Sequence, residues 1–212
     1  MKKRVMAIVA VLLFGAVIIS KGFAESANNS NVEIIDFPPL TVNYSQSIKE
    51  LLRLGDYRLF KDVITAETLF TDDEKFDYKK TGRAELNIAL VNFKFDQPEN
   101  NRKVLKRIKK LGFQPADFQE LLAFGIEHPE EQLKYTIAAL GTIFPSWYGN
   151  KGYECAAILF SVKPERYFTF DPKAINPPPY IVNNSSEYRT LSLFVIGLED
   201  WTDEHYFLVV RK

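Results

Sequence analysis

RAELNIALVNFKF, residues 83–95, is the clearest structural pattern in the chain. Leu86, Ile88 and Leu90 alternate with polar or small residues, which indicates a half-buried β-strand. Phe93 and Phe95 alternate in the opposite phase. Because a slip of one residue turns every side chain to the other face, this change of phase predicts a bulge or a strand end near Asn92.

Two amphipathic helices are predicted directly after this strand. The first covers residues 98–111, has an apolar stripe with helical spacing, and ends at Gly112. The second covers about residues 116–124 and stops at Gly125. Residues 128–134 then form a further helical turn.

The last third of the chain is predicted to be β-structure. The candidate strands are residues 137–144, 153–162, 166–170, 191–196 and 206–211. Residues 147–152 contain the glycines and the asparagine that are typical of a hairpin loop. A strand, two helices and several strands in this order predict a single α+β domain over residues 83–212.

Residues 32–82 are interpreted as an N-terminal extension of this domain. Residues 32–44 are extended in pattern and are interrupted by Pro38-Pro39. Ser47 and Glu50 have the spacing of a capping box, which predicts a short helix over about residues 47–54.

The chain begins with the features of an export signal. Three basic residues follow Met1, the run from Val5 to Ile19 is apolar, and small residues at Gly22 and Ala24 suit a cleavage site. We therefore expect a signal peptide over residues 1–24, a flexible leader over residues 25–31, and a secreted or periplasmic domain. The alternative is an uncleaved N-terminal anchor, although a spanning helix needs roughly 20 apolar residues.

Composition narrows the classes of partner. Four of the 27 Lys and Arg lie in residues 1–24, so residues 25–212 carry 23 of them against 27 Asp and Glu. A mildly acidic protein is not drawn to nucleic acid in general, and no nucleic-acid partner is expected. Cys155 is the only cysteine, which excludes an internal disulfide, and its apolar surroundings predict a buried, inert thiol.

One predicted helix is strongly basic. It carries six cations within nine residues: Arg102, Lys103, Lys106, Arg107, Lys109 and Lys110. The interpretation adopted here is a solvated helix face opposite the apolar stripe. If the cations bind a partner, an anionic polymer of the cell surface fits an exported protein better than nucleic acid does.

Two loops carry the candidate ligand-binding residues, which are Trp147, Tyr148, Asp200, Trp201 and Asp203. A sugar ring stacks on an indole, and clustered carboxylates hold hard cations, so such loops can bind a glycan. An acidic turn between two strands, and loop aromatics folded onto the core, explain the same residues without a ligand.

The sequence predicts no catalytic residue, no metal site and no cofactor. His128 and His205 lack the second ligand at metal spacing, and neither a nucleophile elbow nor a phosphate-binding glycine loop is present. A non-enzymatic binding domain is therefore the leading hypothesis. The alternatives are a cell-envelope hydrolase that uses Asp200, Asp203 and His205, and a structural or inhibitory partner of another exported protein.

Three segments of the chain resemble a family of uncharacterised bacterial proteins. They are residues 44–52, residues 111–125, and the C-terminal FLVVRK of residues 207–212. Members of that family read RPATLAELLALG in the middle and end in FLAVRK. The resemblance covers residues 41–212 and implies no particular chemistry, and an export signal departs from what is usual in the family.

A fainter similarity links the chain to bacterial C-type-lectin-like domains. Gln114-Pro115-Ala116 before the second helix and Val210-Arg211 in the last strand are similar to their motifs. That fold pairs its first and last strands, so the resemblance implies that residues 86–95 lie beside residues 206–211. Gln97-Pro98-Glu99 and Trp201-Thr202-Asp203 are near in composition to the calcium and sugar motifs of true lectins, but the first precedes the first helix. The resemblance therefore implies the fold and not calcium-dependent sugar binding.

Overall fold

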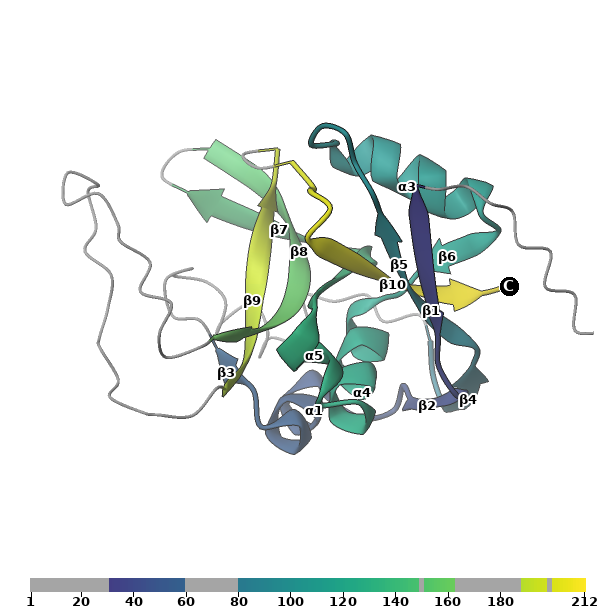
Figure 1. Ribbon diagram of the computed structural model, residues 1–212. Coiled ribbons are helices and arrows are strands. Elements are labelled where there is room, and N and C mark those ends of the chain that lie inside the picture. The colour runs from purple at the N-terminus through teal and green to yellow at the C-terminus, as the bar shows by residue number, and fades with distance from the viewer. Residues whose placement is uncertain (1–30, 60–79, 149–150, 163–187, 198–199) are drawn as a thin grey trace, which may run out of the picture. The chain divides into compact units, whose positions relative to one another are not determined.

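The central strand of the fold is β5 (Ile88–Phe93), which is paired along both edges. The computed structural model describes residues 31–59, 80–148, 151–162, 188–197 and 200–212 (Figure 1). β1 (Val32–Asp36) and β10 (His205–Arg211) flank β5, and both are antiparallel to it. Tyr206 lies opposite Asn92, and Val210 lies opposite Ile88. The predicted pairing of residues 86–95 with residues 206–211 is thereby confirmed.

The remaining strands extend this sheet in a mixed order. β10 is parallel to β7 (Thr136–Tyr148), which continues through antiparallel β8 (Lys151–Val162) to β9 (Tyr188–Ile196). Short β3 (Arg58–Leu59) lies beside β9, and β6 (Phe113–Pro115) pairs with β10. β2 (Leu40–Asn43) and β4 (Arg83–Leu86) form a separate two-stranded sheet. Strands and helices of this kind in one unit confirm the α+β class.

β5 is buried on both faces, which corrects the prediction of a half-buried strand, and it ends at Phe93, in agreement with the predicted bulge or strand end near Asn92. Its side chains alternate between two core clusters: Ile88 and Leu90 enter one, and Ala89, Val91 and Phe93 enter the other. The register with both neighbours runs through Asn92 without a shift. The change of phase in the sequence arises because both faces of the strand are apolar, and the break in pairing lies at Asn87, between β4 and β5.

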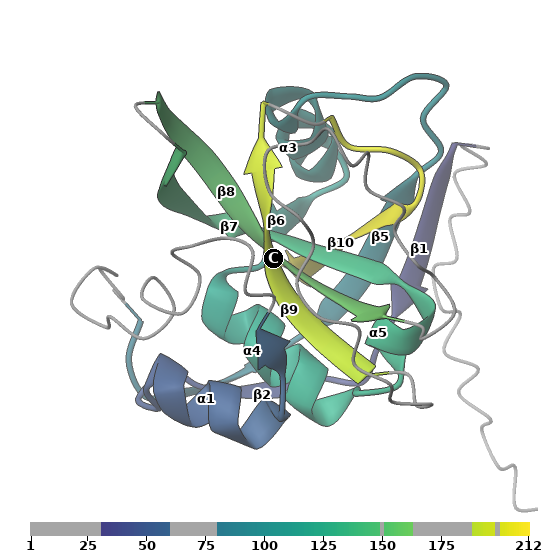
Figure 2. The same cartoon turned by 90° about the vertical axis from the view of Figure 1, so that its left-hand side faces the viewer.

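Helices cover the sheet from opposite sides, as Figures 1 and 2 both show. α3 (Asn101–Lys110) buries Val104 and Ile108 in the core that contains Phe93. α1 (Ile48–Gly55) and α4 (Phe118–Glu127) pack in the other core, and short α5 (Glu131–Lys134) follows α4. All four predicted helical segments are present.

Side-chain caps determine where two of these helices begin. The Asn100 side chain accepts a hydrogen bond from the Lys103 N–H at 3.1 Å, so α3 starts at Asn101 and not at Pro98. Asp117 caps α4 in the same way, with the Glu120 N–H at 2.9 Å. Each cap places the start of its helix two or three residues later than the sequence pattern predicts.

Gly125 does not end α4, contrary to the sequence prediction, because the helix continues to Glu127. A Cβ atom at this position would lie 2.2 Å from the Tyr57 hydroxyl oxygen. The Tyr57 hydroxyl donates to the Leu122 carbonyl oxygen at 2.9 Å. The glycine therefore allows the tyrosine side chain to approach the helix, which is a packing requirement and not a stop signal.

Residues 32–59 belong to the same unit as residues 83–212, although the sequence suggested an extension with a boundary at residue 83. Residues Asn31–Lys212 form one compact unit. Leu40, Val42 and Ile48 are fully buried in the core that α4 also enters, because α1 packs against α4 and β1 pairs with β5. The expected signal peptide at residues 1–24, most of the leader, and the predicted strand at residues 166–170 lie outside the described residues.

Two further properties follow from burial and helix length. Cys155 is buried and forms no disulfide, as the sequence predicts. None of the helices in the described ranges is both long enough and apolar enough to cross a membrane.

Candidate functional site

The predicted binding loop at residues 145–152 is shorter in the structure than in the sequence prediction. Trp147 pairs with Gly152, and Tyr148 pairs with Lys151, so the β7–β8 ladder reaches both aromatic residues. Only residues 149–150 connect the two strands. The side chains of Trp147 and Tyr148 lie outside the described part of the structure, and their role in binding stays a prediction.

Of the second predicted binding loop, residues 198–205, the structure describes residues 200–205, and the tryptophan there is buried and not exposed. Trp201 is 1% exposed and stacks on Phe194, with ring centroids 4.1 Å apart and planes 20° apart. The edges of His205 and Phe207 contact the same indole. The indole therefore has no free face on which a sugar ring could stack, and the residue is part of the core. Asp200 and Asp203 are exposed, and ligand binding by this turn stays a prediction.

In the hydrolase hypothesis Asp200, Asp203 and His205 supply the acid and the base, and the structure places His205 beside Thr202. His205 Nδ1 lies 3.0 Å from Thr202 Oγ1 and 3.2 Å from the Thr202 nitrogen. Within the ranges that the structure describes, no three His, Cys, Asp or Glu side chains are grouped so that they could hold a metal ion. Hydrolysis by Asp200, Asp203 and His205 stays a prediction.

The structure joins the two segments that resemble lectin motifs. Glu99 and Trp201 form a two-way backbone bridge, with both N–H to carbonyl oxygen distances at 2.9 Å. The Glu99 carboxylate accepts a hydrogen bond from Arg107 at 2.9 Å. The bridge ties the segment before α3 to the segment before β10, although Glu99 and Trp201 are 102 positions apart in the sequence.

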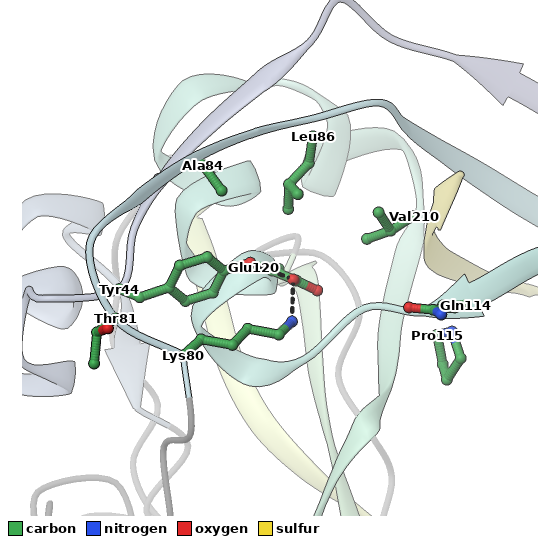
Figure 3. Close-up of a pocket in the computed structure, with 9 residues that line it drawn as sticks. All are labelled: Tyr44, Lys80, Thr81, Ala84, Leu86, Gln114, Pro115, Glu120 and Val210. Atoms are coloured by element: carbon green, nitrogen blue, oxygen red, sulfur yellow. Dashed lines mark hydrogen bonds and ion pairs between the residues drawn. The ribbon is translucent and has the colours of Figure 1, made fainter. Parts of the chain in front are cut away.

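A pocket of about 400 Å³ opens where the two-stranded sheet meets α4 and the end of β10 (Figure 3). Four of the lining residues are apolar, and the polar ones include a hydrogen-bonded group formed by Tyr44, Lys80 and Glu120. The lining residues are Tyr44, Lys80, Thr81, Ala84, Leu86, Gln114, Pro115, Glu120 and Val210. Pockets that bind small molecules typically have such volumes and such mixed walls.

Glu120 is the buried centre of the polar group, with 2% of its surface exposed. Its Oε1 accepts hydrogen bonds from the Tyr44 hydroxyl at 2.5 Å and from Lys80 Nζ at 2.7 Å, and Figure 3 shows the three side chains converging. Its Oε2 accepts from the Asp117 backbone N–H at 2.7 Å, which completes the capping box of α4. A buried carboxylate is stable only when it is paired and hydrogen-bonded in this way.

Lys80 joins Glu120 to a second carboxylate. Its ammonium group also lies 2.7 Å from the Asp117 carboxylate. Burial lowers the pKa of Lys80, but the hydrogen bonds and charges of Asp117 and Glu120 outweigh that effect and raise the pKa above its usual range. Burial, followed by the hydrogen bond to Glu120, raises the pKa of Tyr44 above its usual range. Both donors therefore keep their protons throughout the neutral pH range.

Sequence reasoning did not identify this group of residues. Tyr44, Lys80 and Glu120 lie on segments separated by 36 and 40 residues, and no local spacing relates them. The one available signal was the capping-box pattern from Asp117 to Glu120, since a capping glutamate bends back towards the start of its helix. The pairing of β2 with β4, which brings Tyr44 close to Lys80, has no local signature.

Comparisons with protein-family models, with curated proteins and with solved structures find no match to this chain.

Proposed function

We propose that this chain is an exported binding domain without a catalytic step of its own, and that its pocket receives a small neutral ligand. The observation that carries the proposal is the geometry of the pocket, a cavity of about 400 Å³ beside a carboxylate that is already hydrogen-bonded. Lys80 and Tyr44 both hold their protons at neutral pH, and the Glu120 carboxylate already accepts three hydrogen bonds. The Glu120 carboxylate is committed to holding Tyr44, Lys80 and the start of α4, so the group is suited to positioning a ligand and not to moving protons.

The charges and walls of the pocket indicate the ligand class. Asp117 and Glu120 outnumber the ammonium group of Lys80, so an anionic ligand would be repelled. Leu86 and Val210 offer apolar contact, and Gln114 offers a side-chain amide. A neutral sugar has an apolar ring face and peripheral hydroxyl groups, and it would satisfy both kinds of wall.

Saturation-transfer NMR with neutral mono- and disaccharides tests the pocket. Ala84 lines it, whereas Glu85 is an exposed residue next to it on the same strand. Ala84→Trp should fill the pocket and abolish the ligand signal, and Glu85→Trp should leave the signal unchanged. Thermal denaturation of both variants would establish that they fold. Equal loss of signal in both variants, or no signal from any neutral sugar with the unmodified chain, would count against the proposal.

Export and cleavage are tested by cell fractionation and N-terminal sequencing. We expect the chain outside the cytoplasm with Glu25 as its first residue. A cytoplasmic chain that retains Met1 would contradict this part of the proposal.

We also propose that the domain is C-type-lectin-like. The antiparallel pairing of β5 with β10 supports it, as do the two helices α3 and α4 between the first strand of that pair and the later strands. Superposing an experimental structure of the domain on lectin-like domains tests this. A different order of the strands that the two folds share would disprove it.

A further inference from the structure

The exposed face of α3 carries five cations that have no acidic partner in the described part of the chain. They are Arg102, Lys103, Lys106, Lys109 and Lys110, and all five are exposed. The sixth cation of the helix, Arg107, turns away from this group: it bonds Glu99 at 2.9 Å and lies over the rings of Phe93 and Phe95. The five exposed cations are referred to below as the α3 basic face.

The geometry of the helix concentrates these charges. At about 100° per residue, the five positions fall within an arc of roughly 120°. Arg102, Lys106 and Lys110 follow one another at four-residue intervals, which places them about 6 Å apart along the helix axis. Val104 and Ile108 are fully buried on the opposite side, so the core holds the charged face in a fixed orientation.

Helix stability explains only part of this arrangement, because the helix dipole favours Lys109 and Lys110 in the last turn but not the other three cations. No acidic residue lies within Asn101–Lys110, and like charges four residues apart repel each other. Arg102 and Lys103 occupy the first turn, where the helix dipole disfavours cations. The whole chain has a formal net charge of +0, so the α3 basic face is not a consequence of a basic composition. A folded helix that retains a self-repelling row of charges is suited to binding an opposite row.

We propose that the α3 basic face binds a linear phosphate-bearing polymer, in addition to the ligand proposed for the pocket. Charge complementarity supports an anionic partner, and the repeat along the row supports a linear one. Residues Asn101–Lys110 contain no aromatic side chain, so bases of single-stranded nucleic acid would have no stacking surface. The apolar side of the helix is buried, so it has no residues to insert into a lipid surface.

Binding of a short sodium polyphosphate to the full chain, measured by calorimetry over a range of salt concentrations, tests this inference. The triple variant Arg102→Gln, Lys106→Gln and Lys110→Gln should bind at least tenfold more weakly at low salt. Each lost contact should also reduce the slope of log affinity against log salt by about 0.7–0.9. The matched control is Lys49→Gln, Arg83→Gln and Lys212→Gln, which removes the same charge from exposed positions elsewhere and should bind normally.

Each outcome decides the proposal. Selective loss in the first triple variant, with unchanged circular dichroism, supports it. Equal affinity of the two triple variants, or no binding of polyphosphate at low salt, would overturn it. Tighter binding of single-stranded DNA with the same number of phosphates, or of phosphatidylglycerol vesicles, would assign the face to nucleic acid or to membrane and would also overturn it.

Discussion

Replacing Tyr44 by Phe removes one hydroxyl group and keeps the ring, which is 8% exposed and packs in the core beneath β2 and α4. The hydroxyl is the donor that ties the end of β2 to Glu120, 76 residues further along the chain. The variant therefore measures how strongly the N-terminal strands are held to the rest of the fold.

The magnitude follows from the charge and burial of the acceptor. A hydrogen bond to a charged group contributes about 1.5–3 kcal/mol to stability. The Tyr44–Glu120 bond is 2.5 Å long and buried, so we expect Tyr44→Phe to lower the free energy of unfolding by about 2–3 kcal/mol. In a unit of this size, such a loss lowers the melting temperature by roughly 4–12 °C.

Urea denaturation of four proteins measures this energy: the unmodified chain, Tyr44→Phe, Glu120→Gln and the double variant. The coupling between the two positions should be at least about 1 kcal/mol. Tyr206→Phe is a matched control, since its hydroxyl donates to Glu33 at 3.0 Å and the Glu33 side chain is 43% exposed. It should cost less than about 1 kcal/mol.

Two results would refute the reasoning. A coupling energy below about 0.5 kcal/mol would mean that the hydroxyl and the carboxylate act independently. Equal costs for Tyr44→Phe and Tyr206→Phe would mean that burial of the acceptor has no influence on the strength of the bond.

Three further predictions concern pH and packing. Because the pKa values of Tyr44 and Lys80 are raised, the folded state keeps protons that the unfolded chain releases. The two side chains therefore contribute fully to stability below their ordinary pKa values near 10, and this contribution is lost as the pH rises. The urea midpoint should therefore begin to fall as the pH rises above about 10, and less so in Tyr44→Phe. An equal fall in both proteins would contradict the assignment. Gly125→Ala should lower the free energy of unfolding by about 1–3 kcal/mol, because its Cβ would lie 2.2 Å from the Tyr57 hydroxyl. An unchanged denaturation curve would show that the Tyr57 side chain moves away from the new methyl group without cost. Trp201→Ala should lower the free energy of unfolding by about 3–5 kcal/mol, as expected for a core residue. A change near zero would mean that the indole is exposed and not part of the core.

Local patterns in the sequence were sufficient for most of the secondary structure. The helices at α1, α3 and α4 each have an apolar stripe and a capping residue within a few positions, and both signals depend only on neighbours in the chain. The strands β5, β7, β8, β9 and β10 could likewise be located from their apolar runs. Strand ends and helix starts were less well placed, because side-chain caps and ladder pairing determine them.

Local patterns could not predict in the same way whether each element is buried or exposed. β5 appears half-buried in sequence because Ala89 and Asn92 are not strongly apolar, yet neighbours on both edges and cores on both faces enclose it. Trp201 stands among acidic residues and suggests an exposed binding turn, but Phe194 and Phe207 cover its indole from other strands. Burial depends on what packs against a segment, and those partners are distant in sequence.

The sequence by itself determined the α+β class, the buried cysteine and the basic helix, whereas the pairing partner of the last strand was implied only by the resemblance to C-type-lectin-like domains. The first three each depend on composition, on periodicity, or on motifs within a few residues. Only the tertiary structure decided that residues 32–59 belong to the core and that Tyr44, Lys80 and Glu120 meet in one pocket. The physical reason is that a buried charge requires partners to stabilise it, and the fold supplies them from wherever the chain returns to that point in space.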